Sequence, residues 1–135
     1  MERIMFDVFI SYANSDRDVA ERLVSALRAS NVSGWLDKAD IAAGDSIPSA
    51  VRAALKGSKA VLVLLSPRSL QSEWVQFEIG AAEALGKKIV PVIVSGEHLE
   101  KQFPAILGNR QWIDARHQSH EDVVRDIERA LESAQ

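Results

Sequence analysis

The sequence predicts an α/β fold of the flavodoxin-like class, a three-layer sandwich around a five-stranded parallel sheet of order 2-1-3-4-5. Short apolar runs alternate with longer amphipathic ones along the chain, which is typical of strands connected by right-handed helical crossovers. The run Ala60–Leu65 (AVLVLL) has no polar alternation, as expected of a strand covered on both faces. The length of 135 residues suits one core, so we expect a single domain over residues 1–135.

Two strands and two helices are expected in the first half of the chain. Residues 6–11 are β-branched and aromatic, which predicts the first strand, and Ser15 is the expected N-cap of the helix that follows. Residues 33–37 (SGWLD) predict a short second strand, and the polar loop 40–46 leads to a helix with Pro48 in its first turn. The apolar stripes of the two helices are Val19, Leu23 and Leu27, then Ile47, Val51, Ala54 and Leu55.

The second half continues the alternation after the strand at 60–65. A helix is expected over 72–85, a fourth strand over 88–94 and a short fifth strand over 111–114. The last helix is expected over 120–133, with Ser119 as its cap. Its expected buried residues are Val123, Val124, Ile127 and Leu131.

Composition narrows the classes of partner. The net charge is −3 with acids and bases mixed, so no basic stripe indicates nucleic acid or an anionic membrane. The chain has no cysteine, which excludes disulfides, thiolate catalysis and cysteine-based zinc sites. The N-terminus lacks a signal-peptide layout, and no apolar run approaches the roughly 20 residues that span a bilayer. A cytoplasmic location is expected.

The predicted topology indicates where a ligand would bind. In such sheets ligands lie outside the carboxyl ends of the strands, at the switch point between strands one and three. The segments expected there are 11–14, 37–46 and 66–74.

Glu78 is out of place on a helical wheel. At about 100° per residue it lies about 60° from Val75, within the arc of apolar residues, whereas Glu73 and Glu83 lie on the other side. An unpaired buried carboxylate costs several kcal/mol. Glu78 is therefore either held in a structural pair or faces a wet cleft near the helix start, and we favour the cleft. Trp74, one turn earlier, either stacks on a flat ligand ring or packs in the core.

Five motifs in order carry a family resemblance. They are DVFISY with Asp16 (7–16), WLD leading to AGDS (35–46), VLVLLSP (61–67), SEWV with Glu78 (72–78) and KIVPV (88–92). Over nearly its whole length the chain resembles a TIR (Toll/interleukin-1 receptor) domain. The spacing of Trp74 and Glu78 (WxxxE) is similar to that of the members that cleave NAD⁺ between nicotinamide and ribose. Signalling adaptors of the family often lack this glutamate.

The resemblance implies NAD⁺ as substrate with no further cofactor and no metal, and Glu78 as the catalytic residue. It also implies activation by self-association between TIR domains, in immune or antiphage signalling. We further expect ligand contacts from Ser11, Tyr12, Asp37, Ser46 and Trp74. Turn chemistry explains Ser11 and Tyr12 about equally well, Asp37 either hydrogen-bonds ligand or caps the loop after it, and for Ser46 the role of helix N-cap is favoured over ligand contact. Trp35, in a strand, is expected to pack in the core.

Other functions remain open or are excluded. A non-catalytic adaptor acting by TIR–TIR association is the main alternative, and a nucleoside deoxyribosyltransferase-like enzyme has related chemistry. The chain lacks the acidic residues that a phosphoacceptor receiver domain needs at the strand ends. It also has neither the dinucleotide-binding motif GxGxxG nor the P-loop motif GxxxxGK[ST]. His117 and His120 have i, i+3 spacing, but a metal site is not expected. The short connections suggest a bacterial source, in which case the chain could be the N-terminal part of a protein that carries a sensor module.

Overall fold

The structure, a computed structural model, describes residues 5–36, 49–108 and 110–133. Its five strands are all parallel, in the order β2-β1-β3-β4-β5, which confirms the predicted sheet. The strands are β1 (Phe6–Ser11), β2 (Gly34–Leu36), β3 (Ser58–Leu65), β4 (Lys88–Ile93) and β5 (Ile113–Asp114). The helices are α1 (Arg17–Ala29), α2 (Ser49–Lys56), α3 (Glu73–Ala84) and α4 (His120–Glu132), with 3₁₀ turns η1 (Asn14–Asp16), η2 (Ser69–Gln71) and η3 (Leu99–Gln102).

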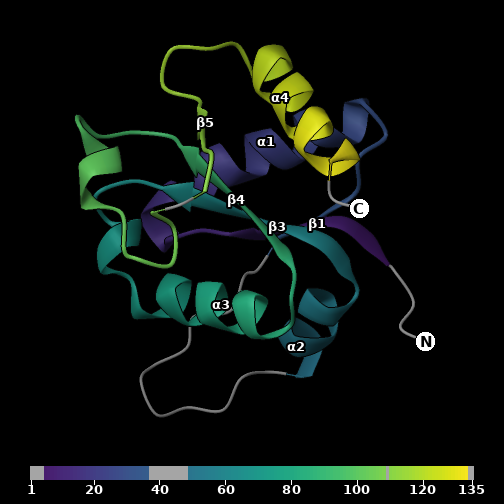
Figure 1. Cartoon of the computed structure of the whole chain (residues 1–135). Helices are drawn as coiled ribbons and strands as arrows, with labels where there is room; N and C mark the ends of the chain where they lie inside the picture. The colour runs from purple at the N-terminus through teal and green to yellow at the C-terminus, as the bar shows by residue number, and fades with distance from the viewer. Residues whose placement is uncertain (1–4, 37–48, 109, 134–135) are drawn as a thin grey trace.

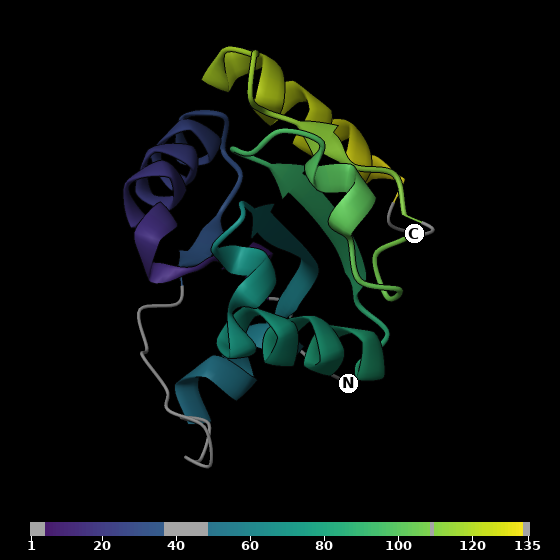
Figure 2. The same cartoon turned by 90° about the vertical axis from the view of Figure 1, so that its left-hand side faces the viewer.

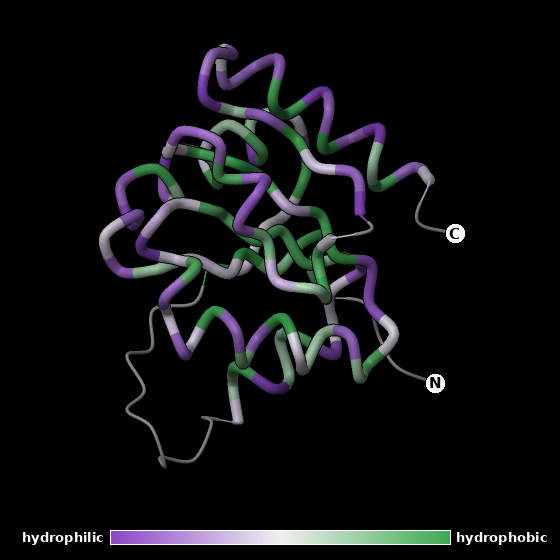
Figure 3. Tube along the Cα trace, turned by 60° about the vertical axis from the view of Figure 1, so that its left-hand side comes forward, coloured by the Kyte–Doolittle hydropathy of each residue, from purple (hydrophilic) through white to green (hydrophobic). Residues whose placement is uncertain are grey.

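The sheet is the middle layer of three. Helices α1 and α4 cover one face, and α2 and α3 cover the other (Figures 1 and 2). Each face has its own apolar core, one containing residues of α1 and α4 and the other residues of α2 and α3. All residues of β3 from Ala60 to Leu65 have an exposed fraction of 0%, which explains why this strand shows no polar alternation. Figure 3 shows hydrophobic residues gathered along the central strands, while hydrophilic and hydrophobic residues alternate along the outer helices.

The alternation of side chains along β1 decides which residues reach which core. Val8 and Ile10 lie in the core under α1 and α4, together with Tyr12 just past the strand. Phe9 lies in the opposite core, where its ring stacks on that of Trp35 with centroids 5.1 Å apart and planes at 21°. Trp35 therefore packs in the core, as expected from its place in a strand.

Some predicted boundaries were wrong. Ser15 is not the N-cap of the first helix: Asn14–Asp16 form η1, and Asp16 stands at the N-cap of α1 without a side-chain capping bond. The Asp16 carboxylate instead accepts a hydrogen bond from Ser66. The fifth strand has only two residues, Ile113 and Asp114, and Leu131 is only partly buried because it lies in the last turn of α4. Among the described helices, none is long and apolar enough to cross a bilayer.

Candidate active site

Helix α3 places Glu78 at the carboxyl edge of the sheet. The helix begins after Ser72, whose side chain accepts a hydrogen bond from the backbone N–H of Val75 at 3.2 Å, as an N-cap does. With the helix start fixed there, the inward positions are Val75, Glu78, Ile79 and Ala82, each exposed by 3% or less. This confirms that Glu78 lies on the apolar face.

The Glu78 carboxylate is fully buried and hydrogen-bonded. Its exposed fraction is 0%, and its Oε1 accepts a hydrogen bond from Ser11 Oγ at 2.5 Å. Ser11 is the last residue of β1 and also has an exposed fraction of 0%. The expectation that Glu78 faces a wet cleft is therefore wrong for this structure, because its side chain has no exposed surface. The alternative of a buried, paired carboxylate is the one observed.

A second pair of the same kind lies at the same edge. Ser66 follows β3, and its Oγ donates to Asp16 Oδ2 at 2.5 Å. The backbone N–H of Ser66 in turn donates to Ser69 Oγ at 2.8 Å. The two pairs cross the switch point in opposite directions. Ser11 ends β1 and bonds to Glu78, which follows β3, whereas Ser66 follows β3 and bonds to Asp16, which follows β1. The sequence analysis missed the second pair, because Asp16 and Ser66 are 50 residues apart and each has an ordinary turn or cap explanation.

Trp74 is half-buried and packs against the core under α2 and α3. Its ring is nearly parallel to that of Phe77, with centroids 5.8 Å apart and planes at 5°, an offset-stacked geometry. Phe77 itself is 44% exposed. The i, i+3 spacing of the two aromatic residues is the signal that could have identified Phe77 from the sequence.

The remaining predicted contact residues are not brought to Glu78 within the described part of the chain. Tyr12 is 4% exposed and belongs to the core under α1 and α4, on the opposite face of the sheet from α3. Asp37 and Ser46 lie outside the described residues. Ser11, also proposed to contact ligand, is hydrogen-bonded to Glu78.

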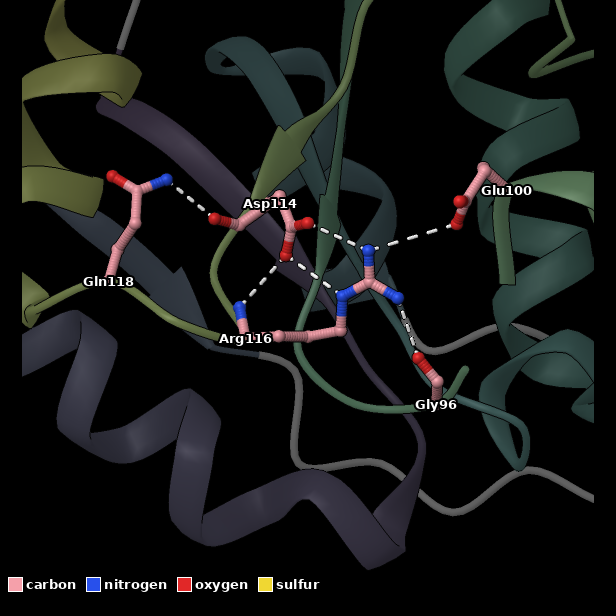
Figure 4. Close-up of polar contacts among 5 residues, drawn as sticks. All are labelled: Gly96, Glu100, Asp114, Arg116 and Gln118. Carbon is pink, nitrogen blue, oxygen red and sulfur yellow. Dashed lines mark hydrogen bonds and ion pairs between the residues drawn. The ribbon is translucent and has the colours of Figure 1, made fainter. Parts of the chain in front are cut away.

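Arg116 is the centre of a polar network at the carboxyl ends of β4 and β5 (Figure 4). Arg116 donates to both oxygens of Asp114, from Nε at 2.9 Å and from Nη2 at 2.7 Å. Its Nη1 donates to the carbonyl of Gly96 at 2.7 Å, and its Nη2 lies 3.8 Å from Oε2 of Glu100. The side-chain hydrogen bonds from Arg116 lower the pKa of Asp114 from 3.8 to about 2. The network joins the ends of β4 and β5 to η3.

The lowered pKa of Asp114 predicts a pH-dependent contribution to stability. A depressed carboxyl pKa stabilises the fold above the unfolded value near 4, and the gain is lost as pH falls through about 2. The Asp114 side chain is 40% exposed, so water screens the pair and we expect a contribution of about 1 kcal/mol. Urea unfolding of Asp114→Asn should show this loss at pH 7 and a shallower fall in stability from pH 4 to pH 2.

Asp126→Asn is the matched control, because Asp126 forms an exposed i, i+3 pair with Arg129 and should change stability by only a few tenths of a kcal/mol. An Asp114→Asn protein with the wild-type pH dependence would contradict the assignment.

The described surface has a hollow away from Glu78. This shallow hollow of 640 Å³ is lined by residues of α1 together with His120 of α4, on the other side of the sheet from Glu78. No group of three His, Asp or Glu side chains in residues 5–36, 49–108 and 110–133 is arranged to hold a metal ion. The case for the site therefore depends on the placement and chemistry of Glu78.

Comparison with curated proteins finds relatives of similar sequence. The chain is 32% identical over 111 residues to "NAD(+) hydrolase TcpA" of Theionarchaea archaeon (strain DG-70-1), covering 78% of this chain and 34% of that protein. It is 29% identical over 89 residues to "2' cyclic ADP-D-ribose synthase BtTIR" of Bacteroides thetaiotaomicron, covering 63% of this chain and 31% of that protein. The chain thus spans about a third of the length of these relatives.

Solved structures agree on the fold. The TIR domain of the Toll-related receptor TRR-2 from Hydra magnipapillata superposes with a TM-score of 0.75 at 21% identity, covering 96% of this chain and 100% of that one. A metazoan TIR-STING receptor from C. gigas superposes with a TM-score of 0.72 at 25% identity, covering 92% of this chain and 40% of that one. The sequence profile of the TIR domain family matches residues 8–134. The chain therefore belongs to the TIR domain family.

Proposed function

We propose that the protein is an NAD⁺ glycohydrolase that cleaves the bond between nicotinamide and ribose, with Glu78 as its catalytic residue. The observation that carries the proposal is a carboxylate held inside an apolar helix face at the ligand-binding edge of the sheet. A residue that costs stability at such a place is typical of a functional site. The printed names of the relatives, NAD⁺ hydrolase and cyclic ADP-ribose synthase, support this substrate.

The chemistry suits a single carboxylate. The C1′–N bond breaks with both electrons going to the pyridinium nitrogen, so nicotinamide leaves as a neutral molecule and the leaving group needs no proton. Positive charge develops on the ribose, and an anionic oxygen placed beside it lowers the barrier. The low dielectric around Glu78 strengthens this attraction. Attack by water, with loss of a proton, gives ADP-ribose, whereas attack by a hydroxyl or ring nitrogen of the same molecule gives a cyclic isomer.

The burial of Glu78 favours a requirement for activation. Because the carboxylate has no exposed surface, NAD⁺ reaches it only after the surrounding chain rearranges. We assign this rearrangement to association between TIR domains, in immune or antiphage signalling in the cytoplasm. The same burial favours the alternative, an adaptor that acts by TIR–TIR association alone and in which Glu78 is structural.

The deciding experiment is nicotinamide release from NAD⁺, followed by chromatography over a range of protein concentrations with and without a crowding agent. We expect release per molecule of protein to rise with concentration, because assembly opens the site. Mass spectrometry of the second product identifies linear or cyclic ADP-ribose. If concentrated, assembled protein releases no nicotinamide, the adaptor alternative replaces the enzyme.

A further inference from the structure

Ser11 has a partner that the sequence did not suggest. As a residue at the switch point, it was expected to contact the ribose or phosphate of a ligand. In the structure it has no exposed surface, and its Oγ donates its proton to Glu78 Oε1 at 2.5 Å. A hydroxyl has one proton to donate, so this proton is committed to the carboxylate.

We propose that Ser11 is a positioning residue, which orients the Glu78 carboxylate and keeps it ionised in its buried site. The inference rests on the proposed NAD⁺ cleavage, since it assigns Ser11 to the same site. A hydrogen bond donated to the charged form of an acid favours that form, whereas burial disfavours it. Ser11 therefore opposes the effect of burial on the group that must be anionic for the reaction.

The donor is held rigidly enough to do this. Ser11 pairs with Val63 in β3, and its neighbour Ile10 pairs with Leu36 in β2 and Leu62 in β3, so the end of β1 is held in the sheet. Glu78 is fixed from the other direction by the Ser72 cap of α3. Because a carboxylate is planar, holding Oε1 also sets the direction in which Oε2 points, and catalysis needs such orientation before substrate arrives.

Several charged groups on the described elements around α3 are exposed, lie at the other edge of the sheet or bond elsewhere. Asp7, Lys59 and Lys88 lie at the amino ends of β1, β3 and β4, the opposite edge of the sheet from Ser11. Asp16 is engaged by Ser66, and Arg68, next to η2, is exposed. On α3 itself Glu73 and Glu83 are exposed.

The structure provides a matched control for Ser11→Ala. Ser66→Ala also removes a buried hydroxyl that donates to a carboxylate at 2.5 Å, at the same edge of the sheet, but its partner is Asp16. Both variants lose a hydroxyl that donates to a carboxylate; Ser66→Ala also removes the acceptor of the Ser69 N–H at 3.1 Å, whereas Ser11→Ala removes the bond to Glu78. Ser11→Thr restores the hydroxyl with a β-branched side chain that strands accept.

The test is the titration of Glu78, followed by NMR of protein labelled with ¹³C in the glutamate carboxyl groups and assigned with Glu78→Gln. In Ser11→Ala the midpoint should move up by about one pH unit, and the acid limb of the pH–rate profile for nicotinamide release should move with it. The maximal rate should fall about tenfold, because the carboxylate is less well oriented. Ser66→Ala should move neither midpoint nor limb, and Ser11→Thr should return both to wild type. Circular dichroism of each variant confirms folding.

The outcomes separate this inference from the proposed function. An unmoved Glu78 titration in folded Ser11→Ala overturns the inference, whether or not the protein cleaves NAD⁺. An equal shift in Ser66→Ala also overturns it, because the effect would then be structural. A shift confined to Ser11→Ala in a protein that releases no nicotinamide supports the inference and refutes NAD⁺ cleavage.

Discussion

Glu78→Gln should lower the rate of nicotinamide release by about a thousandfold. Glutamine has the size and shape of glutamate, so it fits between Val75, Ile79 and Ala82 and still accepts the hydrogen bond from Ser11. It removes the negative charge at almost constant volume, with one oxygen replaced by an NH₂ group, and in the proposed mechanism that charge stabilises the developing cation on ribose. The loss should therefore appear in the maximal rate, measured by single-turnover cleavage with protein in excess over NAD⁺.

Glu73→Gln is the matched control for this variant. Glu73 is the first residue of α3 and exposed, so the same change of charge occurs five positions away, outside the core. Its rate should stay within about twofold of wild type, since exposed charges are well screened. A Glu78→Gln protein that remains folded and cleaves NAD⁺ at the wild-type rate would remove Glu78 from the mechanism.

The second large effect is a loss of stability in Ser11→Ala, which a second substitution should restore without restoring activity. Ser11→Ala leaves the buried Glu78 carboxylate without a donor that it has in the wild type, and a lost bond to a charged group costs about 1.5–3 kcal/mol. In Ser11→Ala/Glu78→Met both polar partners are replaced by apolar groups of similar size, a change that is often neutral or stabilising. We expect the double variant to match the wild type in free energy of unfolding within about 1 kcal/mol and to be inactive.

A double-mutant cycle with urea unfolding measures the coupling. Glu78→Met alone leaves the buried Ser11 hydroxyl without its acceptor. The losses in free energy of unfolding of the two single variants should therefore add up to more than the loss in the double variant. Residues in direct contact typically couple by about 0.5–3 kcal/mol. Additive single effects would show that the Ser11–Glu78 hydrogen bond does not contribute to the fold as the geometry implies.

The sequence was sufficient where the determining pattern is local. The apolar run 60–65 predicted the central strand, and the helical wheel placed Glu78 on a buried face, because both patterns depend on backbone periodicity. The topology rule then brought 11–14 and 66–74 to one edge. The partner of each side chain was not predictable in this way, because the Ser11–Glu78 and Ser66–Asp16 contacts join residues 67 and 50 positions apart.

Two further features have the same origin. Tyr12 was expected at the switch point together with Ser11, and its place in the core under α1 and α4 was not foreseen. Arg116 was considered only in excluding a receiver domain, although it joins Asp114 to Gly96 and Glu100. Its network draws on three separate segments, and no single window of the sequence contains it.

The alternation along β1 has a consequence for how this protein can change in evolution. Ile10 and Tyr12 face one core, and Phe9 faces the other, while Ser11 reaches Glu78 under α3. Because side chains alternate with a period of two, inserting or deleting one residue within β1 would exchange these destinations. The hydroxyl would leave the Glu78 carboxylate in the same event that turns a polar group towards the core. A change of length within β1 therefore disrupts both cores and the Ser11–Glu78 bond at once, whereas a change of length in a connection leaves this alternation intact.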